Sequence, residues 1–374
     1  MVSRKSRIRR LWLAVHLYLG LSIGAIVAVA GVSGALLVFY VELDEILNPE
    51  LALSVQDKPR LSYEALYRTL LGIAPESSTG WRLEIPAEPT RLPTARYYGA
   101  AEAEHSGFAP LLVAVDPYTG EVVKARYWGQ FAMTWLYDLH YTLLLGGIGK
   151  ILMAVIGGLL VVSLVSGVYL WWPPRHKWLT ALSIKPNAGP ERRIYDWHKV
   201  GGIYGLPVLL VLAVSGLALE IPEYVNPLLG RLSPLRESPK PSSKALPGLE
   251  RISVDRAVEI ARRRFPSSRL RWIEMPHGAT GVYRINLRQD GEPGRRFPKT
   301  NVWLDQYSGE ILAENDPATF TAGDTLLSWL HPLHSGEALA LPGRLLVALG
   351  GLVCPLLLVT GVIRWSQKRR AAKR

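Results

Sequence analysis

Four long apolar segments constrain this chain more than any other feature. They cover residues 11–40, about 147–172, about 200–221 and about 341–365. Each is long enough to cross a bilayer as a helix, which needs about 20 mostly apolar residues. The first is too long for the core of a signal peptide and lacks a convincing cleavage site, so we expect a retained anchor. The sequence therefore predicts four membrane spans.

The basic residues, which give the chain a formal net charge of +12, gather in three short segments. These are RKSRIRR near the start, PPRHKW…ERR between the second and third apolar segments, and QKRRAAKR at the end. With four spans, all three lie on one side of the membrane, which the positive-inside rule makes the cytoplasmic side. The distribution of the positive charge therefore predicts the membrane topology, with both termini in the cytoplasm. It does not indicate binding to nucleic acid.

The chain is built from two similar halves. The segment HLYLGLSIGAIVAVAGVSGAL matches HKVGGIYGLPVLLVLAVSGLAL at an offset of 182 residues, and this match aligns two Ser-Gly pairs. The segment LHYTLLLGGIGK matches LHSGEALALPGR at an offset of 194, and downstream it aligns a Ser-Gly with a Thr-Gly pair. Corresponding spans are oriented alike, so this is a parallel repeat.

Each long segment between spans reads as a small α+β unit. LSYEALYRTLLG and ISVDRAVEIARRRF have helical spacing, with a serine placed to cap the first turn. LLVAVDPYTGEVV and KTNVWLDQYSGEIL each predict two strands joined by a tight turn, at Gly120 and at Gly309. The expected fold is an integral membrane α-helical bundle of four transmembrane helices in two duplicated halves, with two small α+β external domains.

The expected order of these parts follows from the same pattern. It is a basic tail (1–10), a span (11–40), an external domain (41–135), a span (136–172), a cytoplasmic loop (173–195), a span (196–222), a second external domain (223–325), a span (326–365) and a basic tail (366–374).

Four of the eight histidines fall at matching places in the two halves. His16 and His198 lie near the cytoplasmic ends of spans one and three, and His140 and His334 near the external ends of spans two and four. An ionisable side chain in a span is costly and by default faces a partner. If the halves pack about a pseudo-twofold axis, His16 meets His198 and His140 meets His334. Neutral imidazole is an axial ligand of haem iron, so the pattern indicates two bis-histidine sites.

Other interpretations of these residues stay open. A duplication also copies structural histidines. Zinc is disfavoured because no Cys, Asp or Glu stands ready to complete a tetrahedral site within the spans, whereas non-haem iron remains an option with Asp138 and Asp196 nearby. His331 could replace or support His334 as a ligand. Six glycines near the histidines either leave room for a flat macrocycle or serve helix contact: Gly20, Gly24, Gly31, Gly34, Gly202 and Gly216.

Several kinds of chemistry are missing from the sequence. The single cysteine, Cys354, excludes an intrachain disulfide, and no CxxCH motif offers covalent haem attachment. No GxGxxG follows a strand and no GxxxxGK[ST] is present, so the chain has no evident nucleotide-binding fold. Electrons must then come from a separate donor, either quinol in the membrane or a cytoplasmic reductase. The remaining histidines are expected at the surface: His105, His176 and His277.

The pattern resembles the PepSY-associated transmembrane family of bacterial inner-membrane proteins. The resemblance covers nearly the whole chain and rests on RRLWLAVHLYLGL, VDPYTGEVV, LDQYSGEIL, the LH before spans two and four, and RRIYDWHKVGGIYG. Within that family the chain is similar to the di-haem ferric-siderophore reductases, such as the ferrioxamine reductase. The resemblance implies PepSY-like periplasmic domains, two non-covalent haem b groups and reduction of ferric siderophore to release Fe(II). The matching histidines are His16, His198, His140 and His334.

Two other functions fit parts of the sequence. PepSY-like domains that bind peptides or inhibit proteases would make the chain a membrane-anchored regulator without redox activity. A siderophore or iron transporter is the other alternative, although few charged residues lie near the bilayer midplane and no paired broken helices are evident. In every case the spans predict a protein that contacts membrane lipid.

Overall fold

The computed structural model describes residues 4–74, 80–98, 110–245 and 248–373. The chain divides into two compact units, and each unit draws on both halves of the sequence. The helical unit contains Met1–Tyr40, Leu136–Val225 and Leu330–Arg374, and the sheet unit contains Val41–Trp135 and Asn226–Trp329.

In the described residues, three helical segments of the helical unit are long and apolar enough to cross a membrane. They are α6 (Gly146–Trp171), α8 (Pro190–Glu220) and the segment Glu337–Ala371, most of which is α12 (Ala340–Ala371). A fourth span is present if α1 (Arg4–Ser22) and α2 (Gly24–Leu37) are counted together.

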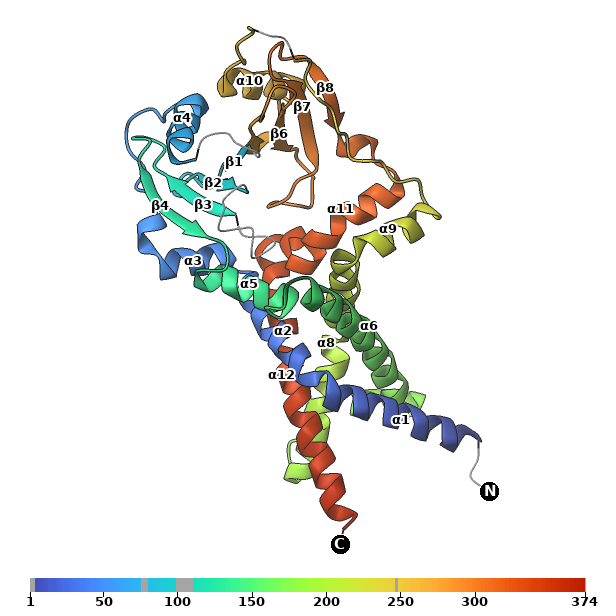
Figure 1. The fold of residues 1–374 in the computed structure, drawn as a ribbon. Helices are drawn as coiled ribbons and strands as arrows, with labels where there is room; N and C mark the ends of the chain where they lie inside the picture. The colour runs from blue at the N-terminus through green and yellow to red at the C-terminus, as the bar shows by residue number, and fades with distance from the viewer. Residues whose placement is uncertain (1–3, 75–79, 99–109, 246–247, 374) are drawn as a thin grey trace. The chain divides into compact units, whose positions relative to one another are not determined.

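The first apolar segment is not one straight helix. α1 and α2 run in different directions (Figure 1), bent by 59° at their junction. Near the bend, the Ser22 hydroxyl donates to the carbonyl oxygen of Tyr18 at 2.7 Å, and glycines stand at positions 20 and 24. Serine back-bonding and small residues both weaken a helix locally, which accounts for a bend at this place.

The second and fourth expected spans are each divided in two. Residues 136–172 fall in α5 (Ala132–Thr142) and α6, and residues 326–365 fall in α11 (Ala322–Ser335) and α12. Both links contain left-handed backbone, which a run of α-helix cannot include. The residues with positive φ in these links and at the first positions of α6 and α12 are Leu143, Leu144, Gly146, Gly336 and Ala340.

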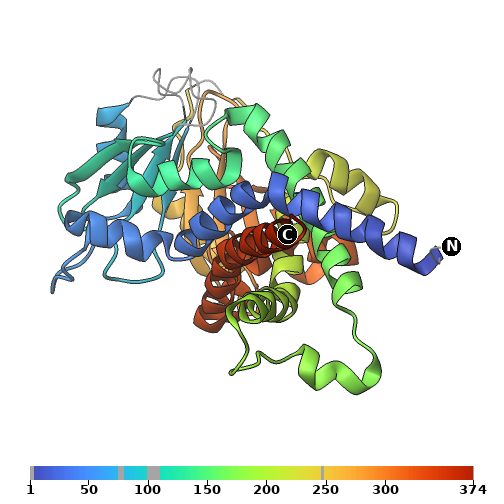
Figure 2. The same ribbon diagram turned by 90° about the horizontal axis from the view of Figure 1, so that it is seen from below.

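The helices pack both within each half and across the two halves. α12 packs against α2 and α8, and α6 packs against α8 and α1; α12 and α8 lie side by side in the view from below (Figure 2). At the α2–α12 crossing, a Cβ on Gly31 would lie 2.8 Å from the Cβ of Cys354, and one on Gly24 would lie 2.9 Å from Leu358. Gly24 and Gly31 therefore serve helix contact and do not leave an open face.

The sheet unit contains one antiparallel sheet of eight strands in the order β4-β3-β2-β1-β5-β6-β7-β8. The two expected external domains are thus joined, because β1 of the first half pairs with β5 of the second, with Leu83 opposite Ile273. Pairing removes the free edge that each four-stranded half would expose. The strands are β1 (Trp81–Glu84), β2 (Thr94–Tyr97), β3 (Leu111–Val115), β4 (Val122–Tyr127), β5 (Arg269–Glu274), β6 (Val282–Arg288), β7 (Thr300–Asp305) and β8 (Ile311–Asn315).

Helices α4 (Tyr63–Ile73) and α10 (Val254–Arg264) share one hydrophobic core with the sheet. The predicted serine caps are confirmed, since Ser62 and Ser253 each accept a hydrogen bond from the backbone of their helix. The two predicted turns are also confirmed, with φ of +78° at Gly120 and +75° at Gly309. The remaining α-helices are α3 (Tyr40–Leu47), α7 (Trp178–Ala181) and α9 (Pro222–Gly230).

The helices α4 and α10 also cap each other. Asp255 of α10 accepts hydrogen bonds from the backbone N–H groups of Tyr63 and Glu64, each at 3.0 Å. Glu64 of α4 in turn accepts from the N–H of Val254 at 3.0 Å. A carboxylate at a helix N-terminus satisfies backbone donors and complements the helix dipole. This reciprocal contact ties together equivalent elements of the two halves.

Candidate functional site

The helical unit brings the four matched histidines together as two pairs. The ring centres of His16 (α1) and His198 (α8) lie 6.2 Å apart, with an angle of 81° between the ring planes. Those of His140 (α5) and His334 (α11) also lie 6.2 Å apart, with an angle of 54°. These are the pairings that the internal symmetry of the sequence predicts.

The separation of the rings in each pair fits a metal ion held between them. If both imidazoles bind one ion at about 2 Å, and each nitrogen lies about 1.1 Å from its ring centre, the centres are about 6 Å apart. Direct stacking of the two rings would bring the centres closer than this. The observed 6.2 Å therefore leaves room for a metal ion between the two imidazoles, and it is also a separation that edge-to-face aromatic pairs adopt.

Each imidazole contacts a hydroxyl group on another helix through its Nδ1 atom. The hydroxyl belongs to a serine in three cases and to a threonine in the fourth. The Nδ1-to-oxygen distances are 2.9 Å for His16 and Ser166, 3.1 Å for His140 and Ser33, 3.0 Å for His198 and Thr360, and 3.0 Å for His334 and Ser215.

These contacts determine the tautomer of the imidazoles. A hydroxyl has one proton, and each of these four donates it to a carbonyl of its own helix at 2.6–2.8 Å, as Ser215 does to Val211 at 2.6 Å. The hydroxyl oxygen must then accept from the imidazole, so Nδ1 carries the proton. The lone pair is left on Nε2, which is the atom that a metal ion would bind, and a hydrogen bond at Nδ1 orients such a ligand.

A glycine follows each of these hydroxyl residues and lies against the same ring. A Cβ built on the glycine would lie between 2.8 and 3.3 Å from Cε1 of the histidine. At Gly34 and Gly216, where this distance is below 3.0 Å, a side chain would force the imidazole to move. At Gly167 and Gly361, a shift of a few tenths of an ångström would accommodate a methyl group. The glycine–histidine contacts are Gly34 with His140, Gly167 with His16, Gly216 with His334 and Gly361 with His198.

The two pairs lie far apart along the helical unit. His198, of the first pair, lies near the start of α8, and Ser215, which contacts His334 of the second pair, lies near its end. The 17 helical steps from one to the other correspond to about 25 Å of α-helix. A single helix therefore holds one member of each site at a separation close to the thickness of a hydrocarbon core.

The Ser-Gly and Thr-Gly pairs are residues of the candidate site that the sequence analysis did not assign to it. The offset of 182 aligns His16 with His198 and also Ser33 with Ser215, and the other two pairs follow the offset of 194. This signal was visible in the sequence as part of the repeat. It did not reveal the role, because each pair acts on a histidine from a different helix.

Other candidate ligands are placed differently. His334, not His331, lies opposite the ring of His140, and His331 lies one turn earlier on α11. The Asp196 carboxylate accepts hydrogen bonds from Arg192 at 3.2 Å and Lys199 at 3.0 Å, so it is engaged away from a metal. His277 is exposed, whereas His105 lies outside the described residues.

The donor set favours haem over a metal ion held by the chain alone. Across the described residues, no group of three or more His, Cys, Asp and Glu side chains is gathered as a metal site. Two opposed imidazoles supply only the axial positions of a six-coordinate iron, and a porphyrin supplies the other four. The two pairs therefore fit axial ligation of haem iron and do not complete a tetrahedral zinc or a histidine–carboxylate iron site.

Comparison with known proteins places the chain in a family. Residues 13–368 match the profile of the PepSY-associated TM region. The chain belongs to the PepSY-associated transmembrane family. Membership in this family, together with the long apolar helices, makes the chain a multi-pass membrane protein.

The chain is similar in sequence to an uncharacterized protein of Pseudomonas aeruginosa. It is 27% identical to this chain over 268 residues, which are 64% of this chain and 65% of the relative. The chain thus matches less than two thirds of that relative's length. The relative's name assigns it no activity.

Proposed function

We propose that this protein is a four-span, di-haem electron-transfer protein of the bacterial inner membrane that reduces ferric siderophore in the periplasm. The observation that carries the proposal is the pair of histidine sites, each with ring centres 6.2 Å apart and with Nδ1 engaged by a hydroxyl oxygen. In this arrangement the free nitrogens belong to neutral imidazoles, the form that binds haem iron.

Two non-covalent haem b groups bound at these pairs would supply one-electron redox chemistry. His16 and His198 would hold one iron, and His140 and His334 the other. With one imidazole from each helix bound to the iron, such sites would suit electron transfer and would leave no open position for oxygen chemistry. The supporting hydroxyls hold each ring in place and raise its basicity, as partners of a metal-bound histidine commonly do.

The basic segments set the direction of electron flow. They favour the cytoplasm for both termini and for the loop after α6, which assigns the His16–His198 pair to the cytoplasmic side and the sheet unit to the periplasm. Electrons enter from quinol or a cytoplasmic reductase. Ferric iron, the substrate, is held by the hard oxygen donors of the siderophore; it gains one electron, and the resulting Fe(II) is bound less tightly and leaves.

The first experiment is an absorption spectrum of the detergent-purified protein, oxidised and then reduced with dithionite. We expect a low-spin spectrum and about two haems per chain by the pyridine haemochrome assay. His16→Ala and His334→Ala should each lose about one haem, while His176→Ala, outside both pairs, should lose none. A colourless protein from cells supplied with haem precursor would contradict the proposal and favour a PepSY-domain binding or regulatory protein.

The reductase activity needs a second experiment. Dithionite-reduced protein, freed of excess reductant under anaerobic conditions, is mixed with ferric siderophore, and Fe(II) is trapped by a chromogenic chelator. We expect reoxidation of the haem spectrum with a matching yield of Fe(II), and neither in the double variant His140→Ala/His334→Ala. Iron uptake into vesicles that contain no electron donor would instead indicate a transporter.

A further inference from the structure

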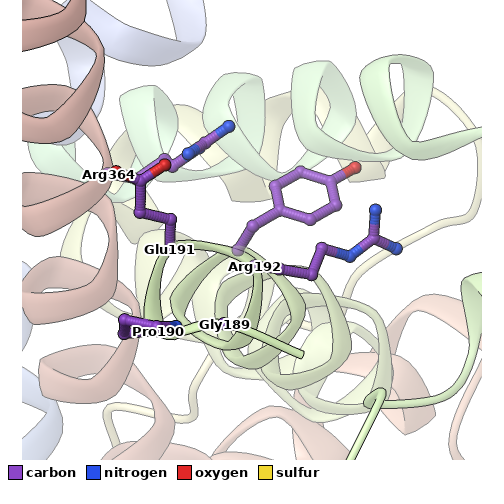
Figure 3. Close-up of a pocket in the computed structure, with 6 residues that line it drawn as sticks. Gly189, Pro190, Glu191, Arg192 and Arg364 are labelled. Carbon is purple, nitrogen blue, oxygen red and sulfur yellow. The ribbon is translucent and has the colours of Figure 1, made fainter. Parts of the chain in front are cut away.

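A cavity of about 630 Å³ opens in the helical unit at the N-terminal end of α8 (Figure 3). Figure 3 shows the side chains of Glu191 and Arg364 at one side of this cavity and that of Arg192 at the other. The lining comes from α8, the residue before it, and α12: Gly189, Pro190, Glu191, Arg192, Tyr195 and Arg364.

The cavity adjoins the His16–His198 pair. Tyr195 lies three residues before His198 on α8, and Arg364 lies three residues after Gly361 on α12. Residues three apart lie on the same face of a helix, one turn from each other. Because Gly361 contacts the ring of His198, Arg364 stands one helical turn from that ring, on the side toward the start of α8.

The cationic groups of the cavity differ in how their charge is compensated. Arg192 is paired with the buried carboxylate of Asp196, with Nε 3.2 Å from each carboxylate oxygen. Arg364 has no carboxylate within ion-pair distance in the part of the chain that the structure describes. Its contacts are a 3.4 Å hydrogen bond to Gln367 and a guanidinium 5.7 Å from the ring centre of Tyr195.

The Nε atom of Arg364 is buried and has no hydrogen-bond partner among the described residues. A buried donor on a charged group costs free energy when it is unpaired. Because Arg364 lines the cavity without a carboxylate partner in the described part of the chain, a negatively charged group in the cavity would compensate its charge, and a planar guanidinium suits a carboxylate in particular.

We propose that Arg364 binds a propionate carboxylate of the haem held between His16 and His198, and that this cavity receives the propionate edge of that haem. The inference rests on the proposed function. The aligned position in the first half, at the offset of 194 residues, is Leu170, which has no charge. On that side the Leu170 carbonyl accepts a hydrogen bond from the Arg9 guanidinium at 3.2 Å, whereas Arg364 lies in the cavity lining and is the arginine assigned to the propionate.

The test compares haem with haem dimethyl ester, whose propionates carry no charge. Each is titrated into the full-length apoprotein in a His140→Ala/His334→Ala background, so that only the His16–His198 pair remains. We expect haem to bind about tenfold more tightly than the ester, since a hydrogen bond to a charged group has about this effect. Arg364→Gln should remove the preference, and Arg364→Lys should retain part of it.

Arg369→Gln is the matched control, because Arg369 is an exposed arginine of the same helix that lies outside the cavity lining. It should keep the full preference. Equal binding of haem and its ester, or an unchanged preference in Arg364→Gln, would overturn the role of Arg364 alone. If Arg364→Gln does not fold, the same titration is made with Arg364→Lys. An unchanged preference for haem over its ester in that variant would also overturn the role of Arg364. No haem binding by the unaltered full-length protein would instead overturn the proposed function.

Discussion

The Nδ1 atom of His140 lies 2.9 Å from the backbone carbonyl oxygen of Ala30, on a different helix. A carbonyl oxygen only accepts, so Nδ1 must carry the proton, and the Ser33 hydroxyl one turn further along α2 reinforces this at 3.1 Å. His16 has the same pair of neighbours, the Ser163 carbonyl at 3.1 Å and the Ser166 hydroxyl at 2.9 Å. The protonation of each ring is thus set by the backbone of a helix that it packs against.

Replacing Thr360 by valine removes the hydroxyl that accepts from Nδ1 of His198 and keeps the shape of the side chain. We expect the haem affinity of the His16–His198 pair to fall about 10- to 100-fold, as for other lost partners of metal-bound histidines. The midpoint potential of that haem should rise, because a less basic ligand stabilises ferric iron less. Both are measured by haem titration and redox titration.

Thr325→Val is the control for that change. Thr325 is an exposed threonine of α11 whose hydroxyl donates to the backbone carbonyl of Thr321, just before the helix, at 2.8 Å. It should leave both haem affinity and potential unchanged. Equal effects of the two substitutions would show that the Thr360 hydroxyl does not act through His198.

Gly216→Ala should abolish haem binding at the His140–His334 pair and leave haem binding at the His16–His198 pair intact. The added methyl group would lie 2.9 Å from Cε1 of His334, closer than carbon atoms pack, so the ring must move away from Ser215. The pyridine haemochrome assay should give about one haem per chain in place of two. Gly158→Ala, where nothing lies within 4 Å, is the control and should retain both. Two haems in Gly216→Ala would contradict the close contact as a determinant of binding.

Gly31→Ala should destabilise the helical unit without touching a histidine. Its Cβ would lie 2.8 Å from the Cβ of Cys354 at the α2–α12 crossing, and overpacking of this kind costs about 1–3 kcal/mol. Thermal unfolding in detergent should shift to lower temperature. Gly20→Ala meets nothing within 4 Å and should be neutral or stabilising, since glycine is a poor helix former. Equal unfolding temperatures for the two variants would argue against a tight crossing.

The turn between β7 and β8 should make the sheet unit sensitive to acid. Burial raises the pKa of the Asp305 carboxyl, but the backbone N–H groups of Ser308, Tyr307 and Lys244 outweigh burial and hold the pKa below its ordinary value. A depressed pKa stabilises the folded state above the unfolded pKa of about 3.9, and this contribution is lost as the pH falls below that value.

Asp305→Asn tests this relationship. Denaturant unfolding followed by tryptophan fluorescence should show a loss of about 1–2 kcal/mol at pH 7, which narrows below about pH 4 as the native carboxylate is itself protonated. Asp57→Asn, at an exposed position, should show little difference at any pH. A gap between Asp305→Asn and the unaltered protein that stays constant down to pH 3 would contradict the role of the charge.

Much of the fold and of the site could be predicted from short segments of the sequence. The apolar segments, the serine caps at Ser62 and Ser253 and the turn glycines at 120 and 309 depend on residues within a few positions of one another. The histidine pairs were also predictable, because the sequence repeat places His16 and His198, and His140 and His334, at equivalent positions, which meet if the two halves pack about a pseudo-twofold axis.

Only the tertiary structure decided how distant segments meet. The pairing of β1 with β5 joins the two expected domains in one sheet. The sequence of an edge strand does not identify its partner, because the backbone groups that form the hydrogen bonds are the same for every residue. The bend between α1 and α2 and the supports of the imidazoles by Ser33, Ser166, Ser215 and Thr360 likewise depend on packing. The sequence by itself determined which residues could bind a metal, and the approach of whole helices determined which nitrogen of each is free to do so.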